Sequence, residues 1–236
     1  MRAFVIVFGL LMVASASAQT TPDRTEEIPP PPGMHNLLVD TSMSFQMVPR
    51  ANADDAFEID LQQDGHGLYR LTKNSEQAWR DIHVSQAVVA IIERGSNAVN
   101  DHRCETKLKN IAKTGKKTIS YVLGPSSSRQ CEFDYSDDNN LNAAAAAFQA
   151  VAETIRMGEQ LKHSLRYDRL GLDAEMDAFV EEVNAGRAIE VQNIAPELQV
   201  IIDDDRVMER VKRKAAHLLE GAGVVVKDYA PEPSAR

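Results

Sequence analysis

The spacing of apolar residues differs between the two halves of this chain, and the difference limits the folds open to it. From Phe57 to Tyr135, apolar and polar residues alternate in several short runs, as in strands with one buried face. After Asn140, apolar residues recur at every third or fourth position, as in amphipathic helices. Strands followed by helices are typical of the α+β class. We therefore predict a small antiparallel sheet of two hairpins plus one strand, packed on helices and followed by an all-helical C-terminal lobe.

The first predicted hairpin spans residues 57–71. Its first strand alternates apolar with acidic residues, and Asp64-Gly65 is a favoured pair for a tight turn. The elements expected next are a short strand over 82–84, a helix capped by Ser85 and a helix end near Gly95.

The N-terminus has the three parts of a secretory signal peptide. Arg2 precedes an apolar run from Ala3 to Ala14, and Ala16-Ser17-Ala18 fits a cleavage site of small residues. The run is shorter than the ~20 residues that cross a bilayer. We expect cleavage near Ala18, a periplasmic or secreted location, and no transmembrane segment in the mature chain.

The two cysteines flank the second predicted hairpin, in which Thr114-Gly115 is the turn. In this register Leu108 lies opposite Tyr121 on the buried face. Cys104 and Cys131 have the parity of that buried face, and thiols of an exported protein are normally oxidised. We therefore predict a structural disulfide between Cys104 and Cys131, from the hairpin to the following strand.

The same hairpin is rich in lysine, and two interpretations stay open. The lysines could attract a polyanion or an anionic surface, or they could keep an outward face solvated and discourage edge pairing. The residues of this candidate anion-binding face are Lys107, Lys109, Lys113, Lys116 and Lys117.

In the second half, helix signals follow one another closely. Asp137 to Asn140 can cap a long helix that ends near Gly171, and Gly186 closes the next helix. Pro196 suits a first helical turn, and Asp203 to Asp205 can cap a last helix that ends at Gly221.

These signals, with the prolines at 29–32, divide the chain into five parts. Whether residues 34–48 dock on the folded domain stays open. The expected parts are a signal peptide at 1–18, a Pro-rich linker at 19–55, an α+β domain at 56–170, a helical extension at 171–227 and a disordered tail at 228–236.

The sequence contains no nucleophile-elbow, zincin, P-loop or dinucleotide-binding motif. Its formal net charge of −9 argues against nucleic acid as a partner. One cluster of thioether and imidazole groups could bind Cu(I), although methionine is also an adaptable apolar filler. That candidate metal set is Met34, His35, Met43 and Met47.

Three segments carry a resemblance. They read C-E-F-D-Y-S at 131–136, R-Y-D-R-L-G-L-D-A-E at 166–175 and V-M-E-R-V-K-R-K-A-A-H-L-L-E at 207–220. The chain resembles uncharacterised secreted bacterial proteins of unknown function over roughly residues 100–221. The resemblance implies export and no particular activity, so it assigns no catalytic residue.

These observations favour an exported, non-catalytic binding or interaction module of unknown ligand that needs no cofactor. Its candidate partner is a protein or a polyanionic component of the cell envelope. Two alternatives stay open. One is periplasmic copper handling through the methionine and histidine set, and the other is an enzyme whose site assembles from dispersed residues.

Overall fold

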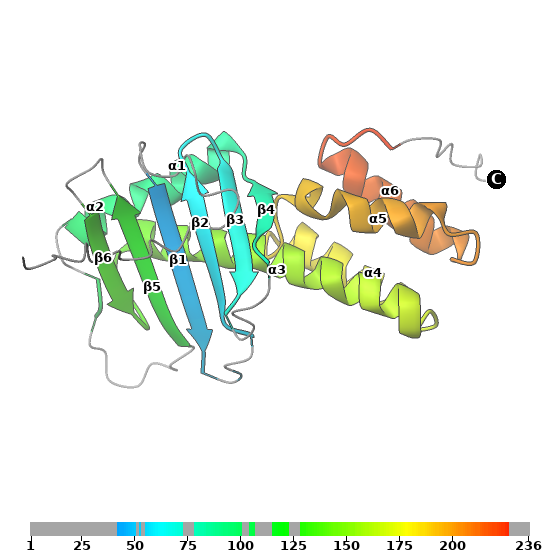
Figure 1. Cartoon of the computed structure of the whole chain (residues 1–236), viewed down its shortest axis with the longest axis horizontal. Helices are drawn as coiled ribbons and strands as arrows, with labels where there is room; N and C mark the ends of the chain where they lie inside the picture. The colour runs from blue at the N-terminus through cyan, green and yellow to red at the C-terminus, as the bar shows by residue number, and fades with distance from the viewer. Residues whose placement is uncertain are drawn as a thin grey trace, which may run out of the picture. The chain divides into compact units, whose positions relative to one another are not determined.

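Six antiparallel strands form one sheet in the order β4-β3-β2-β1-β5-β6 (Figure 1). The predicted α+β class is confirmed. The computed structural model describes residues 42–50, 52, 55–72, 78–100, 104–106, 115–122 and 128–226. The strands are β1 (Ser42–Pro49), β2 (Phe57–Gln62), β3 (His66–Leu71), β4 (Arg80–His83), β5 (Gly115–Val122) and β6 (Ser128–Phe133).

The first predicted hairpin is confirmed as β2 and β3. The side chain of Asp64 accepts a hydrogen bond from the His66 N–H at 2.9 Å, which closes the turn. Gly65 has a φ of +89°, and a Cβ there would lie 2.1 Å from the main-chain oxygen of Val84. Only glycine fits this position, because the positive φ disfavours any side chain and because a Cβ would clash with the Val84 oxygen.

Strand β1 corrects the predicted linker, because Ser42–Pro49 lies inside the range 19–55. It is a central strand, paired with β2 on one side and β5 on the other. Met43, Phe45 and Met47 point into the core and alternate with more exposed Ser44 and Gln46, as a strand with one buried face requires.

Strand β5 corrects the second predicted hairpin. Both of its edges carry partners, since Tyr121 lies opposite Met43 of β1 and opposite Arg129 of β6. The predicted hairpin paired Tyr121 with Leu108. In the structure, both edges of β5 at Tyr121 are taken by β1 and β6 instead. The other predicted strand of that hairpin, from Lys107 onward, lies outside the described residues.

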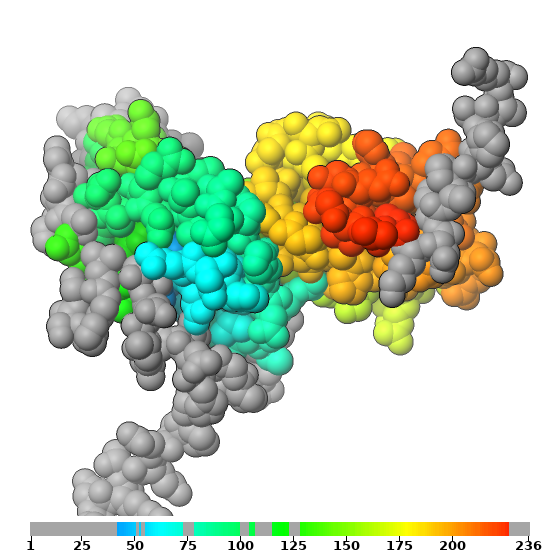
Figure 2. Space-filling view, turned by 90° about the horizontal axis from the view of Figure 1, so that it is seen from above, coloured from blue at the N-terminus to red at the C-terminus, as the bar shows by residue number. Residues whose placement is uncertain are grey.

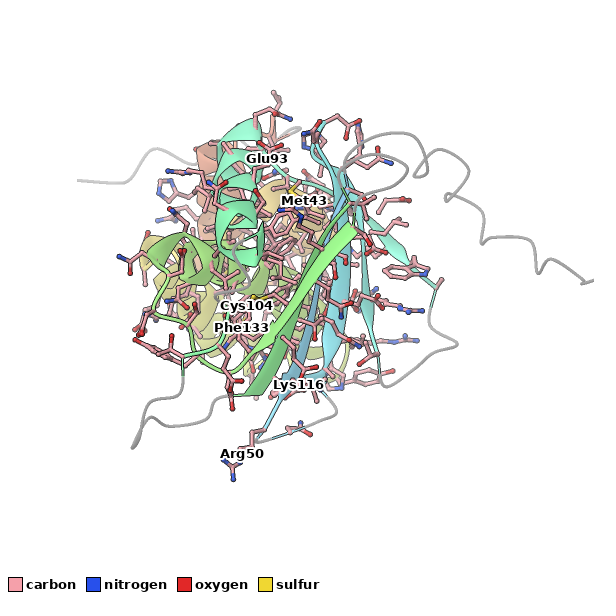
Figure 3. The ribbon with its side chains drawn as sticks, turned by 90° about the vertical axis from the view of Figure 1, so that its left-hand side faces the viewer. Met43, Arg50, Glu93, Cys104, Lys116 and Phe133 are labelled. Atoms are coloured by element: carbon pink, nitrogen blue, oxygen red, sulfur yellow. A yellow bond between two sulfur atoms is a disulfide. The ribbon has the colours of Figure 1, made fainter. Side chains whose placement is uncertain are left out.

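The helices that pack on the sheet all cover one of its faces, with Met43 and Phe133 between the two layers (Figure 3). Ser85 is the N-cap residue of α1, as predicted, but its hydroxyl bonds elsewhere. Asp138 caps α3 by accepting from the N–H groups of Asn140 and Leu141. These helices are α1 (Gln86–Arg94), α2 (Ser96–Asn100) and α3 (Asn139–Tyr167).

A second core lies in the helical region, and it begins inside α3 at Met157 rather than at the predicted boundary of 170/171. The last helix also differs from the prediction. Asp204 does not cap it, because its carboxylate binds Arg206, and Met208 occupies the N-cap position. The elements here are α4 (Leu172–Asn184), η3 (Val191–Ile194), α5 (Ala195–Asp203) and α6 (Glu209–Gly221).

Polar contacts join β4 to the helical region. The Asn193 side chain accepts from the His83 N–H at 2.7 Å and donates to the His83 main-chain oxygen at 2.9 Å. It thus takes the place of a further strand at this sheet edge. Arg80 pairs with Glu159 at 3.1 Å and with Glu197 at 3.0 Å.

No helix within the described ranges is long and apolar enough to cross a membrane. The predicted signal peptide at 1–18 and tail at 228–236 lie outside those ranges, so both stay predictions.

Candidate ligand-binding groove

The two described lysines of the predicted anion-binding face lie on opposite faces of β5. Lys116 points away from the helices and pairs with Glu132 at 2.6 Å. Lys117 points to the helix side, where its ammonium donates to the main-chain oxygen of Asp134 at 2.9 Å. Burial lowers the pKa of Lys117, against the opposing effect of Asp134. Strand β5 therefore does not present a shared basic face. The other candidates, outside the described residues, are Lys107, Lys109 and Lys113.

The two described residues of the predicted copper set are core residues. Met43 and Met47 are 1% and 8% exposed and belong to the core. They lie four residues apart on one strand, which separates their Cα atoms by about 13 Å. Both side chains pack in the hydrophobic core, and the Met47 sulfur accepts from the Gln149 amide at 2.9 Å, so copper binding by this set stays a prediction. Met34 and His35 lie outside the described residues.

Cys104 and Cys131 form a disulfide, with their Cα atoms 5.9 Å apart. Cys131 lies on the buried face of β6, opposite Ile119, and Cys104 packs against the same core. Figure 3 shows Cys104 beside Phe133, on the helix side of the sheet. The disulfide therefore ties a segment that precedes β5 to the edge strand β6, as a structural staple does.

A groove is lined by the ends of β1 and β3, by the start of β2 and by α3. Figure 1 shows these strand ends at the bottom of the sheet. Because the strands are antiparallel, β1 and β3 end here and β2 begins here. Its main hollow has a volume of about 280 Å³. The apolar lining is Met47, Pro49, Phe57, Tyr69, Leu71 and Ala152, and the polar lining is Asp55, Gln149, Glu153 and Arg156. We call this hollow and its neighbour, described below, the Tyr69 groove.

Tyr69 is the central residue of the groove. Its side chain is 7% exposed and lines both hollows, and its ring lies 6.2 Å from that of Phe57. Burial raises the pKa of its hydroxyl to about 12. This hydroxyl makes no hydrogen bond to another described residue, and its oxygen stays open to solvent at the groove. A ligand in the groove could therefore take the place of water as its hydrogen-bond partner.

The charged side chains at the main hollow come from two elements. On α3, Arg156 pairs with Glu153 through two hydrogen bonds, one of them 2.8 Å long. These bonds, and more weakly the charge of Asp55, raise the pKa of Arg156. Asp55 precedes β2 and accepts a hydrogen bond from the Asn52 amide at 3.0 Å. No ion pair to Asp55 exists among the described residues.

The neighbouring hollow is smaller, about 100 Å³, and shares Tyr69, Leu71 and Arg156 with the first. Its other cations are already neutralised. Arg80 binds Glu159 and Glu197, while Arg70 binds Glu58 at 2.7 Å. The guanidinium groups here therefore hold the walls together rather than offering a free positive charge.

A second groove lies in the helical region between α4, η3 and the end of α6, with a volume of about 540 Å³. Figure 2 shows these segments side by side, in yellow and red. Glu190 on its wall has a φ of 59°, the only positive φ of a non-glycine residue in the described ranges. Its carboxylate accepts from the N–H and the hydroxyl of Ser85, at 3.0 and 2.6 Å. Glu190 therefore fixes the start of α1 to the helical region, a structural role.

None of the groove residues was singled out for function from the sequence, apart from Met47 as a metal ligand. Tyr69 and Leu71 were expected only as strand residues. The one available signal is a polar stripe on α3, where Gln149, Glu153 and Arg156 recur at helical spacing. Such a stripe is also typical of any solvated helix surface, so it could not by itself indicate a site.

No protein-family model matches the chain, and no similar sequence was found among curated proteins. The resemblance to secreted bacterial proteins of unknown function therefore stays a prediction.

Proposed function

We propose that the protein is an exported binding module, and that its ligand or a side chain of its partner places an apolar body in the Tyr69 groove. The observation that carries the proposal is the Tyr69 hydroxyl. It is the polar tip of a residue that is 7% exposed, it faces the solvent of the groove, and no described residue bonds to it. A ligand hydrogen bond would replace a water there, so the hydroxyl can orient a ligand whose apolar body is bound by the walls.

The lining supports the same proposal. Small-molecule sites are concave and mostly apolar, with a few convergent polar groups. The aromatic rings of Phe57 and Tyr69 and the thioether of Met47 supply the apolar wall, and the rim supplies the polar groups. The groove of the helical region is larger, but its lining has no Phe, Tyr or Trp and its Glu190 already has partners.

Export is supported by the residues up to Ala18 and by the disulfide, which is typical of oxidising compartments. We expect N-terminal sequencing of the protein from a secreting host to begin at Gln19. An N-terminus that still carries residues 1–18 would contradict export with cleavage.

Binding is tested with a neutral fluorescent probe, N-phenyl-1-naphthylamine. Trp79 is the only tryptophan of the chain, and the neighbouring Ala78 lines the smaller hollow. We therefore expect energy transfer from Trp79 to the bound probe with a stoichiometry near one. The variants Ala152→Phe and Gln149→Phe, which add bulk to the groove without adding a second tryptophan, should abolish the transfer.

The matched control is Ala174→Phe, which adds the same bulk at an exposed position of α4. It should leave probe binding unchanged. Circular dichroism and a thermal melt establish that each variant is folded. Equal probe binding by the wild-type protein and by a folded Gln149→Phe variant would overturn the proposal.

A further inference from the structure

Resting on the proposed function, we infer that the Tyr69 groove selects an organic cation, an ammonium group carried on an apolar body. Three features of the groove converge on this ligand class: a carboxylate without an ion pair among the described residues, two aromatic rings and a hydroxyl open to solvent. The carboxylate belongs to Asp55, the rings to Phe57 and Tyr69, and the hydroxyl to Tyr69.

The charge of the main hollow is the first feature. Its lining has two carboxylates, Asp55 and Glu153, and one cation, Arg156. Arg156 is held by two hydrogen bonds to Glu153, so these two charges cancel. The charge of Asp55 stays unmatched within the described ranges. A carboxylate ligand would be repelled by Asp55, and an ammonium group would be attracted by it.

The aromatic wall is the second feature. The rings of Phe57 and Tyr69 lie 6.2 Å apart and line the hollow together. The face of an aromatic ring carries partial negative charge, so it attracts a cation as well as an apolar body. The Tyr69 oxygen, the third feature, can accept a hydrogen bond from an ammonium N–H. An anion could use the hydroxyl as a donor, but it would gain nothing from the ring faces.

The test compares three molecules of similar shape and different charge: benzylammonium, benzyl alcohol and benzoate. Titrations of the purified protein, followed by amide chemical shifts, give the three dissociation constants. We expect benzylammonium to bind at least tenfold more tightly than benzyl alcohol, and benzoate to bind most weakly. Added salt should narrow the gap between benzylammonium and benzyl alcohol, since charge produces it.

Two variants locate the effect. Asp55→Asn keeps an oxygen that can accept from Asn52 and removes the charge, so it should bring benzylammonium to the affinity of benzyl alcohol. Asp205→Asn removes an equal charge from an exposed turn of the helical region and should change neither affinity. A preference for benzylammonium that survives Asp55→Asn would overturn the inference.

The outcomes separate the two proposals. Binding of all three probes with equal affinity, or tightest binding of benzoate, overturns the cation inference and leaves the binding groove standing. Binding of none of them, together with no uptake of the naphthylamine probe, overturns the proposed function itself.

Discussion

The hydroxyl of Tyr121 on β5 donates a hydrogen bond to the main-chain oxygen of Ile92 in α1, at 2.7 Å. Tyr121 is 1% exposed, and burial raises the pKa of this hydroxyl, with a smaller contribution from Glu93. The same oxygen of Ile92 also accepts from the N–H of Gly95 at 3.0 Å. The Ile92 oxygen therefore accepts two hydrogen bonds, and the one from Tyr121 links the sheet to the last turn of α1.

Replacing Tyr121 by Phe should lower the free energy of unfolding by about 0.5–1.5 kcal/mol. The loss is small because the oxygen of Ile92 keeps its bond from Gly95 and is not left unpaired. Urea denaturation of the two proteins measures the difference. A loss of more than roughly 3 kcal/mol would mean that the ring and not the hydrogen bond is being disturbed.

Replacing both Cys104 and Cys131 by Ser should lower the free energy of unfolding by about 3–4 kcal/mol. The two cysteines are 27 residues apart, so the disulfide closes a loop that restricts the unfolded chain. Denaturation of the wild-type protein with and without a reductant gives the matched comparison. Free thiols that react with an alkylating reagent before reduction would contradict the disulfide.

The hairpin of β2 and β3 could be predicted from the sequence because its determinants are local. Alternation fixes both strands, and Asp64 and Gly65 make the turn. Strand β5 could not be predicted in the same way. Its partner β1 lies far upstream in the sequence, and alternation alone does not say which strands pair.

At Gly95 the sequence predicted the helix end correctly but did not show why the residue must be glycine. It was expected only as a helix end, and α1 does end at Arg94. Its φ is −63°, which any residue could adopt. Glycine is needed because a Cβ would lie 2.6 Å from the Tyr121 hydroxyl and 2.8 Å from the Cβ of Ala144. The Tyr69 groove was missed for a related reason, since its walls meet only after β1, β2, β3 and α3 have packed.

Replacing Arg80 by Met should destabilise the protein by about 1–3 kcal/mol, less than for a fully buried pair, because it leaves the mostly buried Glu197 without a cation. Glu197 is 11% exposed, and one of its carboxylate oxygens is buried without a described partner. Adding Glu197→Gln to Arg80→Met should recover part of the loss. Thermal or urea denaturation measures both variants.

The matched control breaks an exposed ion pair instead. Arg187→Met removes the partner of Glu182, and Arg187 is 57% exposed. Water replaces the lost partner there, so the unfolding midpoint should hardly move. An equal loss of stability in Arg80→Met and Arg187→Met would show that burial of the pair does not matter.

The last prediction concerns Asp60, which lies between Ser44 and Leu68 on the sheet face away from the helices. Burial raises its pKa from 3.8 to about 6; the charge of Glu58 adds to this, and Arg70 opposes it. The folded protein therefore holds this proton more tightly than the unfolded chain does. Its stability should fall as the pH rises from about 4 to about 6, because folding must then keep a buried carboxylate ionised.

Asp60→Asn removes that cost. At pH 7 it should raise the free energy of unfolding by about 1–2 kcal/mol, a figure reduced from the full effect because the carboxylate is only partly buried. At pH 4 the gain should be much smaller, since Asp60 is then protonated in the folded protein and half protonated in the unfolded chain. Urea denaturation of both proteins at the two pH values measures this difference. An equal effect of the substitution at pH 4 and pH 7 would show that the aspartate is not the titrating group.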